Sequence, residues 1–255
     1  MQLIKKISKP YVAFESQLDV FIADFNTQGT PFGDQDRNSL KLFSLNGKTV
    51  NIKSFRIPNL VNKIAYRFFR KSKAQRSFEY AHKLLELKIG TPQPIAYYAF
   101  NTSLAFNKSY YISEQLDCDL TFRELTREHD YPNHETILRA FTRFTFELHE
   151  KGVYFLDHSP GNTLIKEIDG AYHFYLVDLN RMEFKPMDFD ARMKNFERLT
   201  PHKSIVETMS DEYAKLYDAP KDKIFDAIWT NTKTFQERFH KRRRLKKKLK
   251  FWKKK

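Results

Sequence analysis

Strand-forming residues on either side of two tight turns predict two antiparallel hairpins. In the first, SLKLFSL and KTVNIKSF flank Asn46-Gly47, and in the second, TLIKEI and AYHFYLV flank Asp169-Gly170. Both dipeptides tolerate the positive φ that primed two-residue turns require. Further strands are expected in TPQPIAYYAF and in SLAFNKSYYISEQL, which runs into a linker.

Hydrophobic residues at helical spacing predict four helices. The first is KAQRSFEYAHKLLELKIG, which Gly90 can end. The most regular covers residues 133–151, with Asn133 as its N-cap and Gly152 as its stop. Two more are expected in SIVETMSDEYAKLY and from about Asp222 into the C-terminal tail.

The composition indicates a globular chain. Of its 255 residues, 41% are hydrophobic, with 24 Phe and 13 Tyr, which supports a real core and argues against disorder. Cys118 is the only cysteine, so an intramolecular disulfide is impossible, and we interpret it as a packing residue in a reducing compartment. Neither a signal peptide nor an apolar run that could span a bilayer is evident, so the protein is expected to be cytoplasmic.

The positive charge is concentrated in the tail. The chain has a formal net charge of +14, but residues 241–255 hold eleven Lys or Arg and no acid, which leaves 34 basic and 31 acidic residues elsewhere. If this tail is helical, Leu245, Leu249 and Trp252 share one stripe among the cations. That pattern favours binding to an anionic membrane surface. A nucleic-acid patch and a plain disordered tail are the alternatives.

The second hairpin predicts a small site rich in oxygen ligands. Asn162 lies about eight residues before its turn and Asp178 about eight residues after it, so the hairpin returns both side chains to the same end. An amide oxygen and a carboxylate suit a hard cation such as Mg²⁺. Asp157 precedes the turn residues Ser159-Pro160-Gly161 and is expected to face the substrate.

The order of Asp157, Asn162, a hairpin and Asp178 resembles the catalytic loop and metal-binding motif of the protein-kinase-like fold. The resemblance implies that Asp157 orients or deprotonates the acceptor hydroxyl, and that Asn162 and Asp178 hold magnesium. Phe155-Leu156 stands where protein kinases have His-Arg before the catalytic Asp. Asn180 stands where they have Gly two residues after the metal-binding Asp. Such departures are commoner in kinases of small molecules than in regulated protein kinases.

The same resemblance implies a nucleotide site in the first half of the chain. Lys53, on the second strand of the first hairpin, would contact the ATP phosphates, and Glu79 of the following helix would hold it, with Glu86 as a competing candidate. The residues around Glu114 and Leu116 would form a hinge whose backbone binds adenine.

The sequence gives little sign of two further kinase elements, the glycine-rich loop and the platform for a peptide substrate. Gly29 and Gly33 lie where a glycine-rich loop would cover the phosphates, although an ordinary turn explains them better. An Ala-Pro-Glu element and an obvious phosphorylatable activation loop are missing from the sequence after Asp178, so a platform for a peptide substrate is not expected.

SKAQRSFEYAHKLLELKIGTPQPIAYY, SYYISEQL, DHSPGN and LVDLNRM together resemble the bacterial lipopolysaccharide core kinases, a family of heptose and Kdo (keto-deoxy-octulosonic acid) kinases. This implies an α+β, two-lobed kinase-like fold, with a β-rich N-lobe over residues 1–116, a mainly helical C-lobe over 117–240 and a basic tail over 241–255. It also implies transfer of the γ-phosphate of ATP, with Mg²⁺, to a sugar of the lipid A inner core at the cytoplasmic face of the inner membrane.

Three alternatives remain open. The enzyme could phosphorylate a protein or another small molecule, although the missing peptide platform argues against a protein. A pseudokinase would bind a membrane or a partner without chemistry, but it would have no physical reason to keep Lys53, Asp157, Asn162 and Asp178 together. The third alternative is an RNA-binding kinase-like protein, for which the basic tail is the main argument.

Overall fold

The computed structural model describes residues 2–33, 38–55, 71–101 and 106–252, with side chains up to Lys247. The chain forms two compact units. Unit 1 consists of residues 1–117 and the short segment 176–180, and unit 2 consists of residues 118–175 and 181–255. The fold combines β-rich and helical parts, which confirms the expected α+β class.

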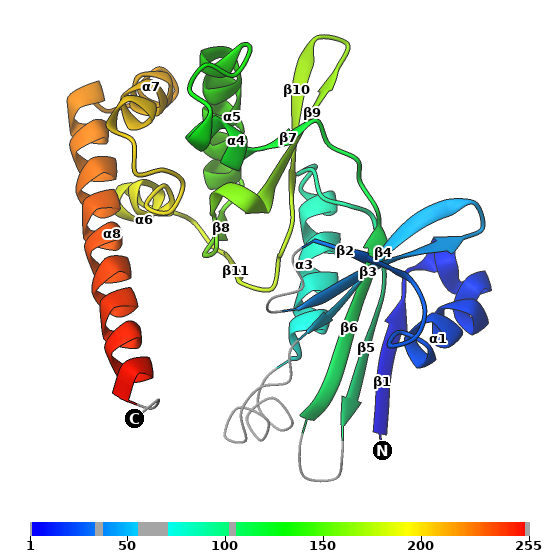
Figure 1. Cartoon of the computed structure of the whole chain (residues 1–255). Coiled ribbons are helices and arrows are strands. Elements are labelled where there is room, and N and C mark those ends of the chain that lie inside the picture. The colour runs from blue at the N-terminus through cyan, green and yellow to red at the C-terminus, as the bar shows by residue number, and fades with distance from the viewer. Residues whose placement is uncertain (1, 34–37, 56–70, 102–105, 253–255) are drawn as a thin grey trace. The chain divides into compact units, whose positions relative to one another are not determined.

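Unit 1 is built on a six-stranded antiparallel sheet in the order β1-β5-β6-β4-β3-β2 (Figure 1). Its elements are β1 (Gln2–Ile7), a 3-10 helix η1 (Lys9–Phe14), α1 (Glu15–Ala23), β2 (Thr30–Phe32), β3 (Ser39–Leu45), β4 (Lys48–Phe55), α3 (Lys73–Glu86), β5 (Pro94–Asn101) and β6 (Phe106–Glu114).

The first predicted hairpin is present as β3 and β4. Leu45 pairs with Lys48 across the turn, and both turn residues have positive φ, 48° at Asn46 and 78° at Gly47. Lys53 lies on β4, where its backbone is paired with Leu40 on one side and with Tyr111 of β6 on the other. The lysine is therefore carried by a central strand of the sheet.

The sheet buries both of its faces, as two adjacent residues of β5 show. Tyr97 belongs to a small core with Phe78 of α3, while the next residue, Tyr98, belongs to the larger core formed with α1. Side chains alternate between faces along a strand, so α3 and α1 cover opposite faces of the sheet. The helix that carries Glu79 is thereby fixed against the strands that follow it.

Helix α3 confirms the predicted helix but ends earlier than expected. Ser72 caps its N-terminus by accepting a hydrogen bond from the Gln75 backbone N–H at 3.1 Å. At the other end, Lys88 takes a left-handed conformation (φ 57°), two residues before Gly90. The backbone N–H of Ile89 donates to the carbonyl of Leu84, which satisfies a carbonyl of the last turn. Lys88, not Gly90, therefore ends the helix.

Unit 2 is mainly helical, with two small sheets. β10, β9 and β7 form one sheet in that order, and β11 and β8 form the other (Figure 1). Its elements are β7 (Leu120–Thr121), α4 (Phe122–Arg127), α5 (His134–Glu150), β8 (Val153–Phe155), a 3-10 helix η2 (Pro160–Asn162), β9 (Thr163–Ile168), β10 (Ala171–Leu176), β11 (Met182–Phe184), α6 (Phe189–Asn195), α7 (Lys203–Ala214) and α8 (Lys221–Trp252).

Three of the four predicted helices lie in this unit, as α5, α7 and α8. Asn133 and Gly152 bound α5 as expected, but Asn133 is left-handed (φ 57°) and its amide donates to the Tyr172 hydroxyl at 3.3 Å, so its side chain does not cap the helix. Ile137, Phe141 and Leu148 of α5 are buried. The expected tail, 241–255, continues α8 without a break as far as Trp252.

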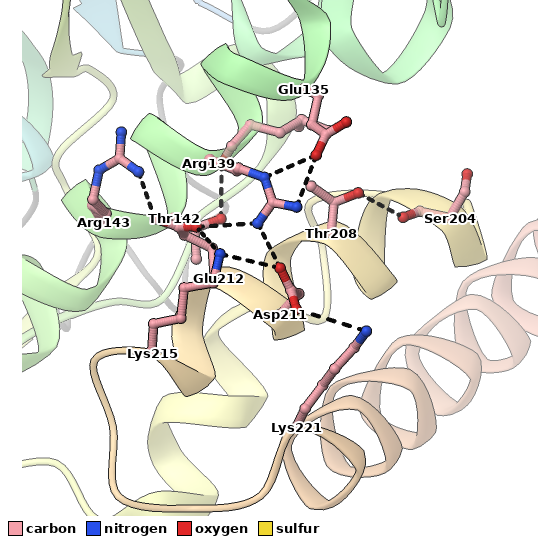
Figure 2. Close-up of polar contacts among 11 residues, drawn as sticks. Glu135, Arg139, Thr142, Arg143, Ser204, Thr208, Asp211, Glu212, Lys215 and Lys221 are labelled. Carbon is pink, nitrogen blue, oxygen red and sulfur yellow. Dashed lines mark hydrogen bonds and ion pairs between the residues drawn. The ribbon is translucent and has the colours of Figure 1, made fainter.

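A cluster of ion pairs joins α5 to α7 (Figure 2). Glu212 of α7, with its side chain only 8% exposed, accepts hydrogen bonds from Arg139 at 3.1 Å, from Lys215 at 3.0 Å and from Arg143. Burial disfavours its charge, but hydrogen bonds from these three cations outweigh burial and hold the pKa of Glu212 below its usual value. Glu212 is thus ionised and fully paired near neutral pH.

Replacing Glu212 with Ala should destabilise the protein by about 2–3 kcal/mol, because it removes a largely buried carboxylate that pairs with three cations. The matched control is Glu135→Ala, which also removes a carboxylate that binds Arg139, but one whose side chain is 67% exposed. Its expected cost is below about 1 kcal/mol. Urea unfolding of both variants measures the difference, and equal costs would mean that the buried position has no special importance.

Candidate functional site

Unit 1 brings together two residues that the sequence separates by 125 positions. Lys53 Nζ of β4 lies 2.7 Å from Asp178 Oδ1, and the two side chains are only 16% and 30% exposed. Asp178 is positioned by the preceding Leu176, whose N–H donates to the carbonyl of Gly90 at 2.8 Å and whose carbonyl accepts from Thr91. A cation and a carboxylate are thereby fixed side by side at one edge of the nucleotide-binding candidate region.

Asp178 has an unusual backbone, and its side-chain contacts with the described residues use a single carboxylate oxygen. Its φ is 58°, a left-handed conformation that costs a residue other than glycine about 1 kcal/mol. Asn180 Nδ2 donates to Asp178 Oδ1 at 2.7 Å, and Lys53 binds the same oxygen. Oδ2 is therefore the oxygen through which Asp178 could bind a cation.

Glu79 does not meet Lys53 in this structure. Instead, Lys71 Nζ lies 2.7 Å from Glu79 Oε2, and Gln75 donates to Glu79 Oε1 at 3.0 Å. The competing candidate, Glu86, pairs with Lys83 at 3.3 Å. The expected lysine–glutamate pair is thus replaced, within the described part of unit 1, by the Lys53–Asp178 pair.

The expected hinge follows β6 and is tied to the sheet. The Gln115 backbone N–H donates to the carbonyl of Thr49 at 2.9 Å, and the Gln115 amide donates to the carbonyl of Leu116 at 3.2 Å. The side chain of Glu114 accepts from the Tyr11 hydroxyl at 2.7 Å and from Lys48 at 2.6 Å. The Glu114 carboxylate is therefore occupied by Tyr11 and Lys48 of unit 1. An adenine base would have to bind backbone groups of this segment.

The two candidate glycines flank a short strand. Gly29 (φ 79°) and Gly33 (φ 74°) lie on either side of β2, and residues 34–37 are outside the described residues. A Cβ on Gly29 would lie 2.5 Å from the ring of Phe43, so the tight packing here requires glycine. This packing explains Gly29 without a ligand.

The candidate catalytic loop belongs to unit 2 and directly precedes the second hairpin. The predicted Asp169-Gly170 turn is present, with φ of 51° and 76°, between β9 and β10. Asn162 immediately precedes β9, and its Nδ2 donates to the backbone carbonyl of Asp157 at 2.8 Å. This bond orients the amide so that Asn162 Oδ1 remains for a cation, and it closes the loop that carries Asp157.

Arg198 is a contact of Asp157 that the sequence did not indicate. Its Nη1 donates to Asp157 Oδ1 at 2.8 Å, and its guanidinium carbon lies 5.1 Å from the ring centre of Phe235 in α8. A guanidinium placed over an aromatic ring still has its N–H groups available, because they point outward in the plane of the guanidinium. Forty-one residues separate Arg198 from Asp157, so no local motif could have revealed the pair.

Two buried histidines pack beneath the surface of unit 2 next to the loop that carries Asp157. His149 Nδ1 is 2.9 Å from the Tyr213 hydroxyl, and its Nε2 is 3.2 Å from Asn195 Oδ1, while Asn195 Nδ2 donates to the carbonyl of Phe155. His158, next to Asp157, is fully buried beside Phe155. Burial lowers the pKa of His149 to about 3 and that of His158 to about 4. Both rings are therefore neutral at physiological pH.

The folded protein should lose stability as the pH falls below about 6.5. Both His149 and His158 have folded pKa values below that of an exposed histidine, so the unfolded chain takes up protons first. Their stabilising contribution is complete above pH 6.5 and decreases towards pH 4, by up to about 1.4 kcal/mol per histidine and pH unit. Urea unfolding at pH 7.5, 6 and 5 measures the decrease, and His158→Gln should make it shallower.

The donor set near the hairpin suits a cation that keeps few protein ligands. Among the described residues, His, Cys, Asp and Glu side chains nowhere gather in a group of three or more with metal-site geometry. Mg²⁺ typically takes one or two protein oxygens and completes its shell with water and substrate phosphates. Asn162, in unit 2, and Asp178, in unit 1, each offer one oxygen of this kind, whereas a zinc or calcium site would need more ligands.

The end of α8 is strongly basic and exposed. Every residue from Lys241 to Lys247 is exposed, and Leu245 is 52% exposed among the cations. Within the part of the chain that the structure describes, none of the helices has the length and hydrophobicity needed to cross a membrane.

Comparison with known proteins agrees with these features. The family model described as "Lipopolysaccharide kinase (Kdo/WaaP) family" matches residues 26–243. Comparison with curated proteins finds no significant match. Among solved structures, one described as "WaaP in complex with acyl carrier protein" superposes with a TM-score of 0.63 at 16% identity, over 94% of this chain and 99% of that chain. At this identity the structural likeness establishes the fold.

Proposed function

The chain belongs to the lipopolysaccharide kinase (Kdo/WaaP) family, and we propose that it transfers the γ-phosphate of ATP to a Kdo or heptose hydroxyl of the lipopolysaccharide inner core. The family membership makes it a phosphotransferase of the lipopolysaccharide kinase type. The sugar acceptor, the magnesium ion and the membrane location are part of the proposal.

The Lys53–Asp178 pair is the observation that carries this proposal. Within unit 1, the fold places the strand lysine 2.7 Å from the carboxylate that follows the second hairpin. A protein that used the fold only as a scaffold would have no reason to keep a half-buried ion pair on a strained aspartate, because such a pair adds little net stability.

In the proposed reaction, Lys53 binds the ATP phosphates, with backbone groups around Glu114 and Leu116 binding adenine. The Asp157 carboxylate accepts a hydrogen bond from the sugar hydroxyl. This bond orients the hydroxyl for attack, and the carboxylate then takes up the hydroxyl proton. Glu79 is expected to bind Lys53 only after leaving Lys71, its partner in the present structure. The protein thus supplies position and charge, and little covalent chemistry.

Asn162 and Asp178 are the residues proposed to bind magnesium through Oδ1 and Oδ2. The fit rests on their local geometry: the Asn162 amide nitrogen donates to the Asp157 carbonyl, and the contacts of Asn180 and Lys53 with the Asp178 carboxylate both use Oδ1. When bound, the ion would neutralise phosphate charge during transfer. Until then, Lys53 Nζ provides the positive charge beside Asp178.

Transfer of radiolabelled phosphate from ATP and Mg²⁺ tests this function. The acceptors are Kdo-lipid A, a heptose-extended core and a generic protein, with Asp178→Asn as the inactive control. Label on one glycolipid that disappears in the control would establish the reaction and identify the sugar. Label on the protein alone would favour a protein kinase. ATP binding that does not depend on Mg²⁺, with no label anywhere, would indicate a pseudokinase.

The proposed acceptor lies in a membrane, and the basic end of α8 is proposed to hold the enzyme on its cytoplasmic face. Removing residues 245–255 deletes seven lysines and should lower binding to vesicles of anionic phospholipid at least about tenfold, since each cation near the surface contributes ~1 kcal/mol. Activity on a detergent-dispersed acceptor should change much less. Vesicle co-sedimentation and initial rates compare the two, and equal losses would make this segment part of the catalytic domain. A matching loss of RNA binding would revive the nucleic-acid alternative.

A further inference from the structure

A groove of about 830 Å³ runs along the second half of α8 in unit 2. Residues of α8 from Trp229 to Arg244 form one wall, spanning about 22 Å at 1.5 Å per residue. Pro201, just before α7, also lines the groove. The lining residues are Pro201, Trp229, Thr232, Lys233, Gln236, Glu237, Arg238, His240, Lys241 and Arg244.

The groove has an excess of positive charge. Lys233, Arg238, Lys241 and Arg244 line it together with a single carboxylate, that of Glu237. Among the described residues, none of these four cations forms an ion pair with a carboxylate, in contrast to the crowded pairs around Glu212. Cations held together without counter-charges favour a ligand with several negative charges.

The groove also contains a buried polar group without a partner. Thr232 is 1% exposed, and its hydroxyl has no hydrogen-bond partner in the described structure, although it lines the groove. A buried hydroxyl without a partner is costly, so a ligand that supplied an oxygen or hydroxyl would be favoured at this point. Trp229 adds a ring at the same end, and sugars commonly pack on such surfaces because both have an apolar face.

The groove lies close to the catalytic loop within unit 2. Pro201 is three residues after Arg198, and Arg198 contacts both Asp157, at 2.8 Å, and Phe235 of α8. Phe235 lies on the helix between the groove residues Thr232 and Gln236. The groove is therefore linked to the residue that binds Asp157 both through the chain, from Arg198 to Pro201, and through helix α8.

We infer that this groove binds the phosphorylated, acidic sugar headgroup of the glycolipid acceptor, and thereby presents its hydroxyl to Asp157. The inference rests on the proposed function, because it names the acceptor site of the same reaction. Charge complementarity selects an anionic ligand, and the Thr232 hydroxyl with the Trp229 ring selects one that carries sugars. The groove shares Lys241 and Arg244 with the start of the basic tail, but Lys233 and Arg238 lie outside the tail, so these two cations can be tested separately from membrane binding.

Binding of fully deacylated Kdo-lipid A, measured by calorimetry without ATP, tests the groove directly. This probe keeps the charged sugars but has lost its ester-linked and amide-linked acyl chains, so the basic end of α8 has no membrane to bind. The variant Lys233→Gln/Arg238→Gln removes two groove cations and leaves residues 241–255 intact. Its dissociation constant should rise at least tenfold, and that of Thr232→Val about threefold.

The matched control is Lys194→Gln/Lys223→Gln, which removes two exposed cations of unit 2 outside the groove and the tail. Its dissociation constant should change less than twofold. Equal losses in both double variants, or none in either, would overturn the groove and indicate diffuse electrostatics. Vesicles of anionic phospholipid without glycolipid should bind both double variants equally, and a selective loss there would assign the groove to the membrane surface.

The same variants separate this inference from the proposed function. If the probe binds in the groove but no phosphate is transferred to any acceptor, the proposed kinase function is wrong and the inferred binding site is retained. If Lys233→Gln/Arg238→Gln transfers phosphate to Kdo-lipid A with an unchanged KM, the proposed kinase function is retained and the groove is not the acceptor site. Thermal unfolding of each variant shows whether the fold is retained, and Thr232→Ser, which keeps the hydroxyl, should bind like the original protein.

Discussion

Replacing Asp157 with Asn should lower kcat for phosphate transfer by about 10²–10⁴-fold while ATP still binds. The amide keeps the size of the side chain but cannot accept the proton of the sugar hydroxyl, and that proton transfer is the contribution expected of a catalytic base. The side chain is 26% exposed and its partner Arg198 is 31% exposed, so losing the pair should change the free energy of unfolding by less than about 1 kcal/mol. Initial rates and urea unfolding measure the two effects.

Asp190→Asn provides the control for this experiment, because it removes an exposed aspartate of the same unit in the first turn of α6. It should leave both kcat and stability nearly unchanged. If Asp157→Asn retained full turnover, the assignment of the catalytic loop would be wrong. A large loss of stability would mean instead that Asp157 is mainly structural and that the Arg198 contact holds the loop.

Replacing Asp178 with Asn should lower transfer by about 10³-fold and abolish the dependence of ATP binding on Mg²⁺. Asn tolerates the left-handed backbone of this position, where φ is 58°, so the variant removes the charge with little added strain. Loss of the carboxylate removes the proposed anionic magnesium ligand and leaves Lys53 without its 2.7 Å partner. Titration of ATP binding against Mg²⁺, together with initial rates, measures both results.

Asp169→Asn is the matched control for this change. Asp169 also has positive φ, 51°, and it lies in the turn of the hairpin that precedes Asp178, but it is exposed and has no proposed role. Its activity should equal that of the original protein. If Asp178→Asn bound ATP and Mg²⁺ normally, magnesium would have to be held elsewhere, and the proposal for Asn162 would fall with it.

Local chemistry in the sequence was enough to predict most of the elements. The turns at Asn46-Gly47 and Asp169-Gly170 require positive φ, and both hairpins are present around them. The helix over 133–151 follows from apolar residues at helical spacing, and α5 matches it to within one residue at each end. The four motifs SKAQRSFEYAHKLLELKIGTPQPIAYY, SYYISEQL, DHSPGN and LVDLNRM predicted the lipopolysaccharide kinase family, which the family model confirms.

Helix ends and ion-pair partners depended on more than local chemistry. Gly90 was the expected stop of α3, but Lys88 takes the left-handed position, because tertiary packing can impose a conformation that propensity disfavours. Lys53 was expected to meet Glu79 and meets Asp178, while Lys71 binds Glu79. Several carboxylates lie within reach of a long lysine side chain, and only the packed backbone decides which is nearest.

The sequence by itself determined the two hairpins, the longest helices and the family, since these depend on residue types at short spacing. The tertiary structure decided which distant side chains meet. Arg198 approaches Asp157 from 41 residues away, and the neutral His149 under the loop is defined by its burial. The groove along α8 likewise combines Pro201, from the segment before α7, with cations that, in sequence, merge with the basic tail. Contacts between distant segments depend on the packing of the whole unit, and short-range patterns do not encode them.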